Sequence, residues 1–410
     1  MRKIFYCVVA AFLLAACVKE DVSIAKIEEV KNPYAVTPDE AVQLLKSVMG
    51  GESTRAVSVG EIKTLRKSDF VPTTRGAEDG DVIYIVDLEN GGSAVMGADK
   101  RMEPIYAILD ETKISAEKLT LTATRSDDGE QDIEEYVLGL VNNKIQADAR
   151  AISLPEMPIV PRPQRYTKTI NILTKAPLLR TKWGPGAPYS NLFTGDNSIS
   201  CGPIALSQLM YYNRYPANIG NIYFNWSQIA EFEINGNHST TADSHVANFV
   251  YAVANSMIST NSSMTSISGL SQSLSSVGYR NVAQRNYNNQ DVQSMLNCNL
   301  PCLVTGLDPI RDGHSWLIDG CNFFDYNTYE REFDGLNPSI YTDTLISSVQ
   351  TRLVHCNYGW FGDADGYYNS GIFDTTVLLE DDYIDTTVGD IQQYGAGSYT
   401  SSLQIIYYER

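Results

Sequence analysis

One cysteine in the C-terminal half of the chain stands where it could act as a nucleophile. Cys201 directly precedes an apolar segment that we expect to be helical from about Pro203 to Pro216, because proline suits a first helical turn and ends a helix at its far side. The unpaired N–H groups and the dipole of a helix N-terminus favour an anion, and the thiolate anion is the reactive form of cysteine. The alternative is a small buried core residue, a common place for a free cysteine.

A histidine and an asparagine further along the chain could complete a catalytic set. His314 precedes the apolar run 316–318, so we predict that it begins a buried strand, where it could act as a general base. Asn357 ends a second predicted strand, 353–357, and its amide could hold the imidazole in one tautomer. Trp360 could shield that hydrogen bond from water. Together, Cys201, His314 and Asn357 predict acyl transfer through a covalent thioester.

Three segments around these residues resemble the streptopain family, secreted bacterial cysteine peptidases with a papain-like fold. They are CGPIALSQLMYYNRYP, GHSWLIDG and HCNYGWFGDADGYY. The resemblance extends over roughly residues 178–410. It implies a cysteine endopeptidase made as a zymogen, which hydrolyses proteins or peptides. It also implies that Cys201 is the nucleophile, His314 the base, Asn357 its orienter and Trp360 the covering aromatic residue.

The chain departs from the family pattern at several positions near this site. Tyr358 replaces a tryptophan, a Gly-Pro pair follows the nucleophile, and residues 305–306 and Pro185 stand near positions where glutamine is usual. The backbone N–H of Cys201 is therefore the one oxyanion donor that we predict. Two other functions stay open: a non-catalytic surface-binding lipoprotein, and another acyl-transfer enzyme, such as an amidase or transglutaminase, with the same residues.

His355 is the alternative to His314 as the base. It would share a strand face with Asn357, because side chains alternate along a strand. The other two histidines, His238 and His245, lie in polar segments. Chain order and the position within the family favour His314.

The remaining cysteines do not indicate a metal site. Five cysteines follow the N-terminal segment, namely Cys201, Cys298, Cys302, Cys321 and Cys356, and an odd number leaves at least one thiol unpaired. Cys298 and Cys302 could form a disulfide in an exported protein, or Cys302 could belong to the core. No CxxC or HExxH pattern is present, so we predict neither a metal nor another cofactor.

The composition limits the number of domains and the classes of partner that we expect. The chain has 410 residues, 43% of them hydrophobic and 20% charged, which is typical of a folded protein with two or three domains. The formal net charge of −18 repels nucleic-acid phosphates, so we exclude nucleic acid as a partner.

The N-terminal segment 1–17 predicts export. Two basic residues precede an apolar run that ends in Leu-Ala-Ala-Cys17, which is typical of a secretory signal and resembles a bacterial lipobox. Cys17 would then carry a lipid, and this anchor would be the protein's attachment to the membrane. We therefore expect an exported lipoprotein of the outer membrane or cell surface, with release after maturation as an alternative. A plain cleaved signal is the other possibility.

Residues 18–154 predict a separate α+β domain. Thr37, Pro38 and Glu40 give a helix start signal and Gly50 a stop, apolar strands follow between residues 82 and 109, and a helix is expected over 131–150. Past Cys17 this region has no cysteine and no histidine. It resembles the inhibitory pro-region of streptopain-like zymogens. The alternative is a free-standing adhesion or scaffold domain.

A proline-rich linker, 155–170, separates this domain from the predicted catalytic domain, 171–410. Such a segment stays extended and accessible to proteases, so we expect maturation between Arg150 and Lys175. The catalytic domain is predicted to be α+β, with the nucleophile helix packed against an antiparallel sheet. Further helices are expected near 246–257, 269–277 and 291–296, and strands near 301–306, from 316 onward, at 353–357 and at 403–408.

Overall fold

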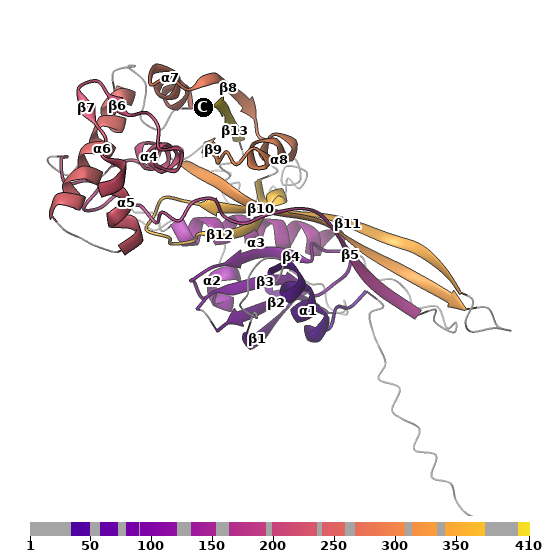
Figure 1. The fold of residues 1–410 in the computed structure, drawn as a ribbon. Helices are drawn as coiled ribbons and strands as arrows, with labels where there is room; N and C mark the ends of the chain where they lie inside the picture. The colour runs from indigo at the N-terminus through magenta and orange to yellow at the C-terminus, as the bar shows by residue number, and fades with distance from the viewer. Residues whose placement is uncertain are drawn as a thin grey trace, which may run out of the picture. The chain divides into compact units, whose positions relative to one another are not determined.

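An antiparallel sheet connects the N-terminal and C-terminal parts of the chain (Figure 1). The computed structural model describes residues 34–49, 58–72, 79–89, 91–120, 133–152, 164–193, 199–235, 240–258, 267–307, 314–333, 341–373 and 401–410. The predicted signal segment with Cys17, the polar stretch after it, and residues 155–163 of the predicted linker lie outside these ranges. We refer to residues 34–152 as the N-terminal region and to residues 164–410 as the C-terminal region.

The described sheet has eleven strands in the order β1-β2-β3-β4-β12-β11-β10-β9-β13-β8, with β5 paired to β10. These strands are β1 (Val59–Arg66), β2 (Asp81–Leu88), β3 (Ser93–Gly97), β4 (Ile105–Leu109), β5 (Gln164–Lys175), β8 (Arg280–Asn286), β9 (Cys302–Leu307), β10 (His314–Phe333), β11 (Tyr341–Asn357), β12 (Gly366–Asn369) and β13 (Ser401–Glu409). Two short strands, β6 (Asn218–Ile219) and β7 (Ile222–Tyr223), pair separately. The pairing of β4 with β12 makes the sheet continuous across the two regions, and residues 34–410 form one compact unit.

The helices pack against this sheet and against one another. They are α1 (Pro38–Met49), α2 (Ala116–Thr120), α3 (Ile133–Ala151), α4 (Cys201–Asn213), α5 (Trp226–Asn235), α6 (Thr240–Ile258), α7 (Ile267–Ser276) and α8 (Asn289–Asn297). Short 3-10 turns are at Lys67–Asp69 and Ser370–Phe373. Within the described ranges, no helix combines the length and the apolar character that crossing a membrane requires.

The first helix begins where the sequence predicts. The Thr37 N–H donates to Glu40 Oε2 at 2.8 Å, and the Glu40 N–H donates to Thr37 Oγ1 at 3.2 Å. This reciprocal pair is a capping box, which satisfies two of the N–H groups that a helix start leaves without partners.

Strand β2 shows how the N-terminal region is organised in layers. Its side chains are buried on both faces: Ile83 and Ile85 join the core cluster that includes α3, while Tyr84 and Val86 join the cluster that includes α1. Because strand side chains alternate between faces, the two helices cover opposite faces of the sheet. This explains why β2 is an unbroken apolar run.

Helix α4 lies against the sheet in the C-terminal region. It contacts β9 and β10 on one side and α6 on the other, and nearly every side chain from Gly202 to Tyr211 is buried. The α+β class and the packing of this helix on an antiparallel sheet, both predicted from the sequence, are confirmed. The helix begins at Cys201 instead of Pro203, and it ends at Asn213 with Arg214 in a left-handed conformation.

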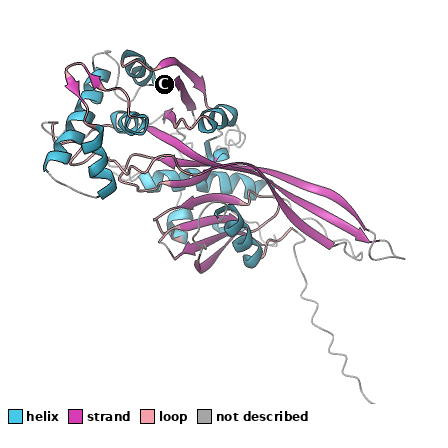
Figure 2. Cartoon of the chain, viewed as in Figure 1, coloured by secondary structure: helices cyan, strands magenta, loops and turns pink. Residues whose placement is uncertain are grey.

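The strands of the C-terminal region are longer than predicted. Strands β10, β11 and β5 run together as a long ribbon (Figure 2). Because β5 begins at Gln164, the segment 164–170 is strand and only the earlier part of the predicted linker can be linker. Arg165, which lies within the range where we expect maturation, forms an ion pair with Glu330 at 3.0 Å.

Candidate active site

Cys201 is the first residue of α4. Its neighbour Ser200 precedes the helix in an extended conformation and makes no side-chain capping bond. The sulfur of Cys201 accepts a hydrogen bond from the Ser315 N–H at 3.3 Å. Part of the residue is exposed, but burial raises the pKa of the thiol, and hydrogen bonds from Ser315, Gly202 and its own N–H only partly offset this.

His314 is the first residue of β10 and the chain neighbour of Ser315. Its side chain is only 7% exposed, and its Nε2 lies 3.2 Å from the Tyr358 carbonyl oxygen. Because a carbonyl can only accept, Nε2 carries the proton and Nδ1 is the basic nitrogen. Burial lowers the pKa of His314 to about 4, so the imidazole is neutral at physiological pH.

Two aromatic rings pack beside this imidazole and against each other. The ring centroid of Trp316 lies 6.0 Å from that of His314 with an interplanar angle of 14°, and that of Tyr358 lies 6.1 Å away at 27°. Trp316 and Tyr358 are also 5.9 Å apart. Trp360, which we predict as the covering residue, is partly buried and packs on the main core cluster; its role at His314 stays a prediction.

Asn357, at the end of β11, links three segments of the C-terminal region. Its Oδ1 accepts hydrogen bonds from Gln208 Nε2 at 2.9 Å and from the Gly359 N–H at 3.2 Å. Its Nδ2 donates to the Thr181 carbonyl at 2.8 Å. The carbonyl that meets His314 Nε2 belongs to the next residue, Tyr358, so the predicted role of Asn357 as direct orienter stays a prediction.

A model of a known protein family matches part of the C-terminal region. Residues 224–368 match the model of the Peptidase C10 family. The match includes His314, Asn357 and Trp360, whereas Cys201 precedes its first residue. The resemblance to the streptopain family and the prediction of a cysteine-type peptidase are confirmed.

Other comparisons add a distant likeness. A solved structure of a fragment of Prevotella intermedia prointerpain A, with one cysteine replaced by alanine, aligns with 85% of this chain and 98% of its own length, at 16% identity and a TM-score of 0.49. No curated protein matches the chain.

The structure contains a buried amide, Gln208, that sequence reasoning missed. Gln208 is fully buried in α4; besides its bond to Asn357, its Oε1 accepts from the Trp183 N–H at 3.4 Å. It follows Cys201 by about two helical turns, so both belong to one helix face. The available signal was a glutamine inside an otherwise apolar helical segment.

His355, the alternative base, has a different environment. Asp319 Oδ1 lies 2.6 Å from its Nδ1 and Asp110 Oδ2 lies 3.2 Å from its Nε2. Both ring nitrogens therefore face carboxylates. His245 lies on α6, and His238 is outside the described residues.

The other cysteines among the described residues are free thiols. Cys298 is exposed, whereas Cys302, Cys321 and Cys356 are buried, and none of them forms a disulfide. In the described ranges no group of His, Cys, Asp and Glu side chains is arranged to hold a metal ion.

Proposed function

We propose that this protein is an endopeptidase that cleaves protein or peptide substrates through a thioester on Cys201, with His314 as the base. The observation that carries this proposal is the position of the Cys201 sulfur: it lies at the N-terminus of α4, 3.3 Å from the N–H of the residue that follows His314. This contact supports the proposal because it puts the sulfur of the nucleophile candidate beside the first residues of β10, the strand that begins with the base candidate.

In this mechanism, the Cys201 thiol transfers its proton to His314 Nδ1 and the sulfur attacks the peptide carbonyl. The imidazolium then protonates the departing amine, and the thioester remains. His314 next takes a proton from water, whose oxygen attacks the thioester and releases the acid and the thiol. The Cys201 N–H is suited to bind the oxyanion.

The surrounding groups would position the base. The Tyr358 carbonyl would keep the proton on Nε2, while Trp316 and Tyr358 would exclude water from the imidazole. We propose that Asn357 acts by fixing the turn that carries Tyr358, because its amide ties this turn to Gln208 and Thr181. Trp360 would cover the outer side of this turn.

We also propose that the protein is an exported zymogen. The N-terminal region would block the peptidase until the chain is cut in the linker, and lipidation of Cys17 would hold the protein at the cell surface. The basic-apolar-Cys17 pattern supports export. Extraction of the Cys17→Ala protein from membranes tests the anchor: unchanged membrane association would contradict lipidation.

The test of the peptidase is the processed protein with Cys201→Ala or His314→Ala, assayed on an unfolded protein substrate. Each change should lower kcat/KM by about a thousandfold or more, whereas Cys298→Ser, an exposed thiol elsewhere, should leave activity unchanged. Mass analysis of products distinguishes peptide cleavage from amide hydrolysis of side chains or amine transfer. Full activity of Cys201→Ala would exclude this mechanism.

A further inference from the structure

His355 lies between two carboxylates that come from different regions of the chain. Asp319, 1% exposed, belongs to β10 of the C-terminal region, whereas Asp110, 47% exposed, follows β4 of the N-terminal region. Burial alone would lower the pKa of His355, but the Asp319 and Asp110 carboxylates outweigh it and raise the pKa to about 10. The imidazole is therefore cationic at neutral pH, and Asp110 is an anionic partner that the other region supplies.

The backbone beside this ion cluster is paired across the same boundary. In the antiparallel pairing of β4 and β12, Leu109 lies opposite Gly366 and Ala107 opposite Tyr368. The Asp110 N–H also donates to the Asp365 carbonyl at 3.3 Å. The N-terminal region thus adds a strand to the edge of the C-terminal sheet, which is a known mode of peptide recognition.

Gly366 allows this close approach. A Cβ atom at this position would overlap the Ile108 carbonyl oxygen and lie 2.9 Å from the Leu109 Cα. The closest atoms to such a Cβ all belong to β4, so a side chain here would meet the N-terminal region first. The contact at β12 is therefore closely fitted to its partner strand.

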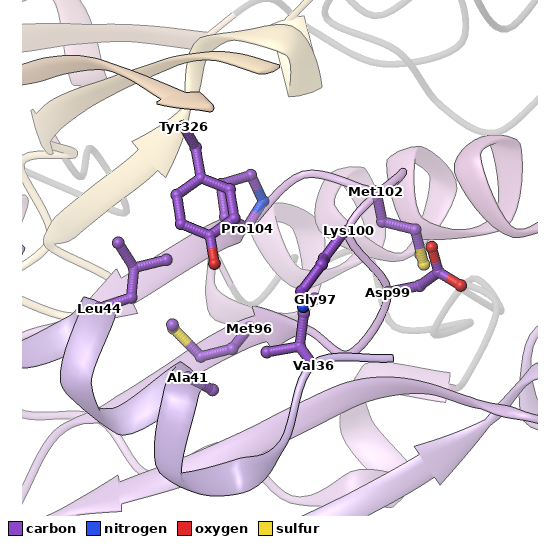
Figure 3. Close-up of a pocket in the computed structure, with 10 residues that line it drawn as sticks. All are labelled: Val36, Ala41, Leu44, Met96, Gly97, Asp99, Lys100, Met102, Pro104 and Tyr326. Carbon is purple, nitrogen blue, oxygen red and sulfur yellow. The ribbon is translucent and has the colours of Figure 1, made fainter. Parts of the chain in front are cut away.

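Two other contacts between the two regions are less closely packed or less buried. Tyr326 of β10 reaches α1 and β3, but a small pocket remains between them, lined also by Leu44 and Met96 (Figure 3). The pair of Glu111 with Lys182 is largely exposed, and such pairs contribute little. The β4–β12 pairing is closely fitted at Gly366, and the Asp110–His355 contact lies directly beside it.

We propose that β12 and His355 form a docking site for the N-terminal region, with β4 as the added strand and Asp110 as the anion, and that this site keeps the two regions together after the chain is cut. Without the N-terminal region, β12 would present an unpaired edge and His355 would lose one of its carboxylates, both of which favour rebinding. The proposal rests on the proposed zymogen only in taking the cut chain as a natural form.

The experiment uses the full chain in a Cys201→Ala background, with a recognition site for a specific protease inserted within residues 155–163. After cutting, size-exclusion chromatography and a dilution series measure the dissociation constant of the two fragments. The variants are Gly366→Ala and Asp110→Asn. The matched controls are Gly80→Ala, where an added Cβ has no atom within 4 Å, and Glu117→Gln, an exposed carboxylate on α2.

The cut protein should stay associated, and both controls should match it. Gly366→Ala should raise the dissociation constant by about a hundredfold, because the added methyl group overpacks the strand pairing. Asp110→Asn should raise it by about tenfold, a moderate value because this carboxylate is half exposed. In a His355→Gln background, Asp110→Asn should have no additional effect. Equal constants for Gly366→Ala and Gly80→Ala, or an undiminished effect of Asp110→Asn without His355, would overturn the proposal.

Activity of the same proteins with Cys201 restored separates this proposal from the proposed zymogen. If Gly366→Ala releases the N-terminal fragment and activity rises, both are supported. If the fragment is released and activity stays the same, the docking site is correct and the inhibitory role is wrong. If the fragment inhibits the Gly366→Ala protein as strongly as the unchanged one, the docking site is wrong and the inhibitory role stands.

Discussion

At Cys201, burial and hydrogen bonding act on the thiol in opposite directions. Burial is the larger effect and raises its pKa, while the N–H groups of Ser315 and Gly202 lower it. Burial also lowers the pKa of His314 to about 4. At neutral pH, thiol and imidazole are therefore both uncharged, whereas a reactive cysteine is a thiolate. This arrangement suits a latent form of the proposed peptidase.

Alkylation of Cys201 in the uncut chain should therefore be slow at neutral pH. The rate constant for a small electrophile, followed by peptide mapping, should still rise at about pH 9, because the thiolate is the reacting species and the pKa is raised. The exposed Cys298 is labelled in the same sample and serves as an internal reference for reagent and pH. A rate at Cys201 that reaches its plateau below about pH 7 would show an ionised thiol and contradict this prediction.

At the scale of elements, α4 connects the proposed nucleophile to the groups around the proposed base. It presents Cys201 at its first residue and Gln208 further along, and Gln208 joins Asn357 of β11 to Trp183. A shift of the helix would therefore move the sulfur and the Asn357–Tyr358 turn together. The arrangement of these groups therefore depends on a buried amide.

Replacement of Gln208 with leucine should destabilise the protein by about 1–3 kcal/mol. The change takes the Gln208 acceptor from the buried Trp183 N–H and the Gln208 donor from the buried Asn357 Oδ1. Equilibrium unfolding in urea measures this. Ser207→Ala is the matched control in the same helix turn, since the buried Ser207 hydroxyl has no hydrogen-bond partner among the described residues; its stability should change by less than about 0.5 kcal/mol or increase. Equal stability of the two variants would contradict the role of Gln208.

The elements that the sequence predicted well have local signals. Thr37, Pro38 and Glu40 specify the start of α1, and the alternation and apolar runs of β2, β9 and β13 specify strands. The first part of β5, residues 164–170, falls within the predicted linker because it lies beside a proline-rich stretch and consists mainly of polar residues, and β8 is also mainly polar. Both owe their conformation to pairing with β10 and β13, which is a long-range effect.

The site was predictable to a similar extent. Cys201 and His314 follow from residue type, flanking pattern and family resemblance. The Tyr358 carbonyl and the Ser315 N–H could not be predicted, because backbone groups carry no signature in the sequence and their direction depends on the turn after β11 and on the start of β10. The Asp110–His355 contact joins residues from two regions that the sequence presents as separate domains.

At the scale of the molecule, ionisable groups are concentrated where the two regions meet. Glu103 of the N-terminal region accepts hydrogen bonds from Asn369 at 2.9 Å and Thr351 at 3.4 Å. Burial raises the pKa of Glu103 to about 7, and it raises that of Asp365, beside β12, to about 7 as well. With His355, these groups bind protons more strongly in the folded protein than when exposed.

The stability of the uncut protein should therefore decrease as pH rises. A raised carboxyl pKa gives stability that is present below the unfolded value of about 4.5 and is lost as pH rises through about 7. For His355, the contribution is complete below about 6.5 and is lost as pH rises through about 10. Both effects have the same sign, so the free energy of unfolding should fall by a few kcal/mol between about pH 5 and pH 9, since a pKa difference of one corresponds to about 1.4 kcal/mol.

Urea unfolding at a series of pH values measures this dependence, and Glu103→Gln separates its parts. The amide oxygen of glutamine can still accept from Asn369 but does not ionise, so the decrease between about pH 5 and pH 7 should become smaller while the decrease above pH 7, which comes from His355, remains. Glu117→Gln, an exposed change in the same region, should follow the unchanged protein at every pH. A free energy of unfolding that rises from pH 5 to pH 9 would mean that carboxylates with lowered pKa values dominate. The raised pKa values assigned to Glu103 and His355 would then be wrong.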